Sequence, residues 1–116
     1  MLGRLLDLFR GRSIVIQGVA KLPDGQSKKF DIGDPLAGGR QFVLCRLDGE
    51  LFAVDALCPH EGGRISDGPL VDGRHVMCPL HNYKFDPKSG AAVGRVCKNA
   101  RTYRVREEQD GCRVWV

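Results

Sequence analysis

The chain has 116 residues, of which 42% are hydrophobic and 28% charged, and its net charge is +4. This length suits one domain with one modest core, and the composition is that of an ordinary soluble globular protein. So small a positive charge does not by itself indicate nucleic-acid binding, and no apolar run approaches the roughly 20 residues of a membrane helix. The 15 glycines and 6 prolines favour many turns and short strands.

The first twelve residues, MLGRLLDLFRGR, form a short N-terminal segment ahead of a single domain over 13–116. Arg4, Asp7 and Arg10 interrupt the apolar residues, and no small-residue cleavage site follows, so the segment is unlike a secretory signal. We expect it either to pack as a short helix or to fray; a membrane-surface or partner-docking helix is the alternative. Five cysteines without a secretory signal argue against a disulfide framework and favour a cytoplasmic location.

The following segment is typical of short strands separated by turns. Residues 13–22 are rich in β-branched side chains and fit a strand that ends at a Pro-Asp-Gly turn. Residues 41–47 and 50–55 are apolar runs joined by Asp48-Gly49. An Asp-Gly pair predicts a two-residue hairpin turn, because both turn positions adopt positive φ.

Turn signals recur along the rest of the chain. A second Asp-Gly pair, at 72–73, separates PLV from RHVM and predicts another hairpin. Gln-Asp-Gly at 109–111 separates the last two predicted strands, 101–108 and 112–116. Many short strands with frequent turns indicate an all-β fold, a small antiparallel sandwich or barrel.

Two cysteine–histidine pairs follow predicted strands directly. Cys58 and His60 lie in LCPHEGGR, and Cys78 and His81 lie in MCPLHNYK. Both pairs therefore occupy loops at strand ends, which a hairpin-rich fold can bring side by side. Cys and His are ligands that suit zinc or iron–sulfur centres, so a metal site explains the pairs better than buried cysteines beside unrelated surface histidines.

Two kinds of metal site fit these ligands. A structural zinc ion takes four ligands, but its pairs are usually Cys-x₂₋₄-Cys or His-x₃₋₅-His, which a Cys-x-His pair fits poorly. A Rieske [2Fe–2S] centre has two cysteines on one iron and two histidines on the other, so each loop contributes one of each. The mixed pairs favour the two-iron cluster over zinc.

The stretch AVDALCPHEGGRISDGPLVDGRHVMCPLHNYKFDPKSG, residues 53–90, resembles the Rieske [2Fe–2S] ferredoxin family almost throughout. The resemblance implies a β-sandwich with a cluster-binding subdomain at one tip and cluster-binding loops around 58–63 and 78–83. It also implies one [2Fe–2S] cluster per chain. The implied ligands of that cluster are Cys58, His60, Cys78 and His81.

The same resemblance implies an electron carrier without catalytic residues of its own. Its donor would be a flavin reductase and its acceptor a terminal oxygenase, and nucleic acid and a membrane span are not expected. The alternative is the small iron–sulfur subunit of a complex similar to NAD(P)H nitrite reductase. In Rieske proteins of respiratory complexes an extra cysteine in each loop forms a disulfide; the matching positions here are Gly63 and Leu80. Tyr83 stands where those proteins have a serine near the cluster sulfur, which predicts a low reduction potential.

The other cysteines and the third histidine are expected to have mainly structural roles. His75 is expected in a sheet, and Cys45 and Cys112 are expected to pack as small hydrophobic side chains. Cys97, in a third loop without proline, either packs similarly or approaches the cluster. A basic run forms either a solvated face or a docking surface for an acidic redox partner; it comprises Arg95, Lys98, Arg101, Arg104 and Arg106.

Overall fold

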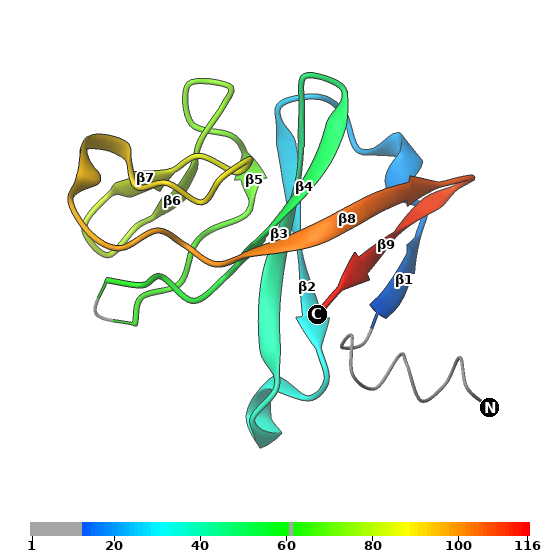
Figure 1. Cartoon of the computed structure of the whole chain (residues 1–116), viewed down its shortest axis with the longest axis horizontal. Helices are drawn as coiled ribbons and strands as arrows, with labels where there is room; N and C mark the ends of the chain where they lie inside the picture. The colour runs from blue at the N-terminus through cyan, green and yellow to red at the C-terminus, as the bar shows by residue number, and fades with distance from the viewer. Residues whose placement is uncertain (1–12, 61) are drawn as a thin grey trace.

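The computed structural model describes residues 13–60 and 62–116, and almost all of its regular structure is antiparallel β-strand (Figure 1). The all-β prediction is therefore confirmed. The N-terminal segment 1–12 and Glu61 lie outside the described residues. The strands are β1 (Ser13–Gln17), β2 (Gln26–Ile32), β3 (Arg40–Leu47), β4 (Glu50–Asp55), β5 (Gly68–Pro69), β6 (Val76–Cys78), β7 (Tyr83–Phe85), β8 (Thr102–Glu108) and β9 (Gly111–Trp115). Three short 3₁₀ helices are η1 (Val19–Lys21), η2 (Pro35–Ala37) and η3 (Val93–Arg95).

Seven strands form one sheet in the order β1-β9-β8-β4-β3-β2-β5, while β6 and β7 pair separately. Strand β8 joins two halves of the large sheet, since it pairs with β4 only at Thr102 and Tyr103 and then continues along β9. Residues 56–60 and 62–100, which carry β5, β6 and β7, form a small lobe that β5 joins to the edge of the large sheet (Figure 1). In the described part of the chain, no helix is long and apolar enough to cross a membrane.

Strand β3 is buried on both faces and connects two hydrophobic clusters. Phe42 and Leu44 pack inside the large sheet, whereas Val43 and Cys45 pack toward the small lobe. This alternation explains the uninterrupted apolar run, because successive side chains of a strand point to opposite faces. Burial raises the pKa of Cys45 to about 12 and that of Cys112 to about 11. Both cysteines are fully buried, as predicted for small hydrophobic side chains.

The Asp48-Gly49 hairpin is confirmed, with φ of 54° and 81° at the two turn residues and Leu47 paired with Glu50. The second Asp-Gly pair also turns, with φ of 54° and 73°. The hairpin predicted there is confirmed only as far as one pair, because the flanking segments are joined by reciprocal backbone hydrogen bonds between Val71 and His75 and do not continue as a ladder. The strand on one side, β5, pairs with β2 instead, and the strand on the other side, β6, pairs with β7.

The predicted strand over 13–22 is too long. It ends at Gln17, because Gly18 adopts a left-handed φ of 79° and η1 follows. A pattern of β-branched residues does not reveal this break, but the glycine within it is the residue that permits positive φ.

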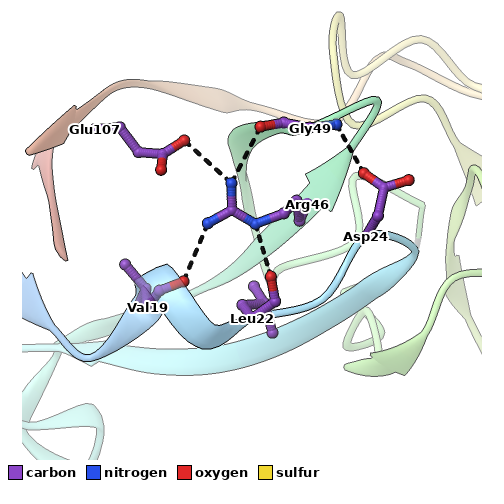
Figure 2. Close-up of polar contacts among 6 residues, drawn as sticks. All are labelled: Val19, Leu22, Asp24, Arg46, Gly49 and Glu107. Carbon is purple, nitrogen blue, oxygen red and sulfur yellow. Dashed lines mark hydrogen bonds and ion pairs between the residues drawn. The ribbon is translucent and has the colours of Figure 1, made fainter. Parts of the chain in front are cut away.

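The guanidinium of Arg46 ties three distant segments together (Figure 2). Its Nε donates to the Leu22 carbonyl at 2.7 Å, and one terminal nitrogen donates to the Val19 carbonyl at 3.1 Å. The other terminal nitrogen contacts the Gly49 carbonyl and the Glu107 carboxylate, both at 3.1 Å. Only 11% of the Arg46 side chain is exposed, so these bonds form away from bulk water.

Replacing Arg46 with alanine is expected to lower the free energy of unfolding by about 2–4 kcal/mol, because it removes three hydrogen bonds to carbonyls and the ion pair with Glu107. Urea titration followed by the fluorescence of the single tryptophan, Trp115, measures the change. Lys84→Ala is the control, since its ion pair with Asp72 is 3.5 Å long and exposed and should contribute less than about 1 kcal/mol. Equal losses in the two variants would contradict the role given to Arg46.

Candidate metal centre

Two short loops of the small lobe bring the cysteine–histidine pairs together. Cys58 follows the end of β4, and its amide donates to the Gly63 carbonyl at 2.7 Å, which closes the first loop. Cys78 is the last residue of β6 and pairs with Tyr83 across β7, which closes the second loop. Strand pairing and this hydrogen bond therefore fix both loops at their bases.

The thiols lie inside and the imidazoles lie at the surface. Cys58 and Cys78 are 2% and 1% exposed, while His60 is half-buried and His81 exposed. The Nδ1 atoms of the two histidines are 3.1 Å apart. Two nitrogens that bind the same metal ion at about 2.0–2.1 Å with tetrahedral geometry stand roughly 3.3–3.4 Å apart. The two imidazoles therefore converge as ligands of the same ion would.

The two thiols form a buried pair suited to a cationic group. Burial raises the pKa of the Cys58 thiol, and neighbouring Cys78 raises it further, against the hydrogen bond from the His60 amide to Cys58 Sγ at 3.4 Å. Thiols that resist ionisation in this way become thiolates when a metal supplies positive charge. This donor set, two buried sulfurs beneath two surface nitrogens, fits an iron–sulfur group with different ligands on its two irons.

Gly63 lies directly against the second loop. A Cβ atom at position 63 would be 2.6 Å from Cys78 Sγ and 3.2 Å from the Leu80 Cβ. The first distance is shorter than real Cβ contacts, so a side chain at position 63 would require the Cys78 sulfur or the loop backbone to shift. The second distance places positions 63 and 80 face to face, near the Cβ separation of about 3.5–4.5 Å in disulfides. With Gly and Leu there, no such bridge forms.

The model of the Rieske [2Fe–2S] domain family matches residues 13–104. The chain belongs to this family. Its members bind a [2Fe–2S] cluster, so the cofactor is the predicted one, and the zinc alternative is set aside.

Individual Rieske proteins resemble the chain over most of its length. It is 36% identical, over 97 residues, to the ferredoxin component of the naphthalene 1,2-dioxygenase system of Pseudomonas aeruginosa, covering 83% of this chain and 86% of that protein. Among solved structures, the Sphingomonas yanoikuyae B1 ferredoxin superposes with a TM-score of 0.71 at 27% identity, covering 90% and 99% of the two chains. A putative NADH-dependent nitrite reductase small subunit from Mycobacterium tuberculosis shares the fold, with a TM-score of 0.63, 22% identity and coverages of 88% and 92%.

Several residues near the Rieske loops take the backbone conformation or the packing that their residue types favour. Gly62 and Asn82 have left-handed φ of 71° and 58°, so asparagine does take the turn position that favours glycine. His75 forms the bridge to Val71 just before β6, in accord with a sheet residue. Cys97 packs as a partly buried side chain, and it does so close to the two thiols of the site. It is half-buried against the hydrophobic cluster that contains Cys58 and Cys78, and burial followed by the nearby Cys78 raises its pKa.

A buried polar network at the root of the first loop was not predicted. The Asp55 carboxylate accepts hydrogen bonds from the Leu57 amide at 2.8 Å and from the Tyr103 hydroxyl at 2.5 Å. Arg40 donates to the same hydroxyl at 3.1 Å. Burial and then Asp55 raise the pKa of Tyr103 to about 12. These residues come from three strands far apart in the sequence, so no local pattern could reveal that they fix the departure of the loop.

The predicted basic run does not form one face. Arg104 and Arg106 lie over the ring of Trp115, at 4.7 and 5.4 Å from its centroid, and Arg101 lies over Tyr103 at 5.2 Å. The ring contacts agree with a solvated strand face for the first two arginines. The remaining two members, Arg95 and Lys98, are exposed in the third loop of the small lobe, where a docking role stays a prediction.

Proposed function

We propose that this chain is a one-electron carrier that receives electrons from a flavin reductase and delivers them to a terminal oxygenase. Cys58 and Cys78 would hold the inner iron of the cluster, and His60 and His81 the outer iron. The observation that carries the proposal is the 3.1 Å approach of the two Nδ1 atoms at the surface, above two buried thiols. Relatives named as ferredoxin components of dioxygenase systems support it.

Each part of the site has a separate task in this proposal. The bound cluster accepts and releases one electron. The buried thiolates place negative charge on the inner side, and the neutral imidazoles bring the outer side to the surface, which shortens the path to a partner. Apolar side chains of the small lobe would contact that partner and exclude water; they are Leu57, Leu80, Val93 and Val96, each between 44% and 52% exposed. Chemistry on a substrate would belong to the partner.

Stopped-flow absorbance spectroscopy tests the proposal with the holoprotein. A flavin reductase supplied with NADH should bleach the visible absorbance of the cluster, and an added oxygenase should restore it. Increasing salt should slow both steps if Arg95 and Lys98 steer the encounter. Holoprotein that stays oxidised with every reductase tried, while dithionite reduces it, would count against the shuttle.

The alternative is a fixed small subunit of a complex similar to nitrite reductase, which the shared fold of such a subunit favours. Copurification from the native host distinguishes the two: a stable stoichiometric complex indicates the subunit, and an isolated monomer indicates the shuttle. A cytoplasmic location agrees with the free state of all five cysteines, since disulfides form mainly in oxidising compartments.

The reduction potential is expected near the low end of the Rieske range, roughly −150 mV. In the described part of the chain, the Tyr83 hydroxyl donates no hydrogen bond to a sulfur, whereas the His60 amide donates one to Cys58. Fewer donors to the sulfurs stabilise the reduced, more negative cluster less. A spectroscopic redox titration gives the value, and a potential above about +100 mV would contradict this argument.

A further inference from the structure

The ring of Tyr83 contacts both histidines of the candidate site. Its centroid is 4.5 Å from that of His60, with 40° between the ring planes, and 5.8 Å from that of His81, with 42° between them. The two imidazoles meet edge to face, with centroids 4.7 Å apart. The three rings thus form one aromatic group at the tip of the small lobe, at centroid separations where such rings attract one another.

This contact joins the two loops. His60 belongs to the first loop, whereas Tyr83 begins β7 at the end of the second, directly opposite Cys78 in the β6–β7 pairing. The left-handed turn at Asn82, with φ of 58°, directly precedes the tyrosine whose ring contacts both imidazoles. The ring also packs against the hydrophobic cluster that contains Cys58 and Cys78, so it has a rigid support.

The contact depends on the ring and not on the phenol group. Tyr83 is half-buried, and within the described residues its hydroxyl makes no hydrogen bond, in contrast to Tyr103, whose hydroxyl bonds to Asp55 and Arg40. A phenylalanine at position 83 would keep every one of the ring contacts.

We propose that Tyr83 is a positioning residue. Its ring holds the two loops together and fixes the orientation of His60 and His81, so that both Nδ1 atoms point toward one iron before the cluster binds. The inference rests on the proposed ligands. It adds that the outer ligands are held by an aromatic support contributed by the second loop alone, and that the hydroxyl is dispensable.

Two substitutions in the holoprotein separate ring from hydroxyl. Tyr83→Leu removes both and should accelerate loss of the visible cluster absorbance to an iron chelator by about tenfold, since two ring contacts are lost. It should also broaden the g values of the dithionite-reduced protein, because the imidazoles then vary in orientation. Tyr83→Phe should match the native protein in chelation rate and in spectrum.

Phe52→Leu is the matched control. Phe52 is also a partly buried ring on the same hydrophobic cluster, but no histidine ring lies against it. This variant should lower the melting temperature as much as Tyr83→Leu does, with native chelation rate and g values. Native behaviour of Tyr83→Leu, or a Tyr83→Phe variant as labile as Tyr83→Leu, overturns the proposal.

A metal-free measurement keeps the inference testable if Tyr83→Leu does not fold. In native apoprotein, nuclear Overhauser effects should connect the Tyr83 ring protons to the carbon-bound ring protons of His60. Their absence overturns the positioning role proposed for Tyr83. The ligand assignment is tested separately. If His60→Ala loses the cluster while Tyr83→Leu keeps the native chelation rate, only the positioning role of Tyr83 is wrong. If His60→Ala keeps a native cluster, the proposed ligand set is wrong.

Discussion

Replacing Cys58 or Cys78 with serine is expected to give a colourless protein with almost no iron. Both side chains are buried, at 2% and 1% exposure, and serine offers a hard, largely protonated oxygen where the irons require thiolate. Iron and acid-labile sulfide per chain, together with the visible spectrum, measure the result. The native protein should contain about two of each, as a [2Fe–2S] centre requires.

The other three cysteines provide the controls. Cys45→Ala and Cys112→Ala remove fully buried thiols away from the loops and should keep iron and sulfide at native levels, although they lower stability. Cys97→Ala should also keep the cluster, because Cys97 packs beside the two proposed ligand thiols without belonging to either loop. Native iron in Cys58→Ser or Cys78→Ser, or loss of iron in the Cys97 variant, would show that the ligand set is wrong.

The second large effect is expected from the smallest change, Gly63→Ala. The new methyl group would lie 2.6 Å from Cys78 Sγ, a distance that real Cβ atoms essentially never show, so either the loop or this proposed ligand would have to move. We expect most of the cluster to be lost on purification and the residual cluster to bleach at least about tenfold faster with chelator. Leu80→Ala in the same chain should not restore it, since the contact with the sulfur remains.

Gly62→Ala distinguishes lack of space from backbone strain. Position 62 has a left-handed φ of 71°, and among the described residues no non-neighbouring atom lies within 4 Å of its added Cβ. Alanine there should cost about 1 kcal/mol of stability through backbone strain alone and should keep the cluster. If Gly63→Ala kept its iron while Gly62→Ala lost it, the need for glycine in the first loop would come from backbone strain in the turn and not from close packing against the sulfur.

Features specified by adjacent residues were predictable from the sequence. Asp48-Gly49 determines its hairpin because both residues tolerate positive φ, and Asn82 takes the left-handed turn for the same reason. The four proposed ligands occur in two short motifs, so they can be identified from the sequence alone. The continuous apolar run of β3 also indicates a strand covered on both faces, as the structure shows for Phe42 through Cys45.

Features that depend on distant partners were not predictable. The hairpin expected at Asp72-Gly73 stops after the single Val71–His75 pair, because the strands beyond it pair elsewhere, and the turn itself gives no information on those partners. The hydrogen bonds of Arg46 to Val19, Leu22 and Glu107 span up to 61 positions in the sequence. The contact of Tyr83 with His60 and His81 likewise depends on how the two loops lie in space, which the sequence around position 83 does not reveal.

The most direct test of the account is whether two histidine nitrogens bind the reduced cluster. Holoprotein labelled with ¹⁵N only in histidine should be reduced with dithionite and examined by pulsed electron paramagnetic resonance. Two strongly coupled nitrogens are expected, as the 3.1 Å pair of Nδ1 atoms implies, and they should be lost in His60→Ala and His81→Ala but not in His75→Ala. A reduced cluster with no coupled histidine nitrogen, or a colourless protein that contains zinc, would contradict it.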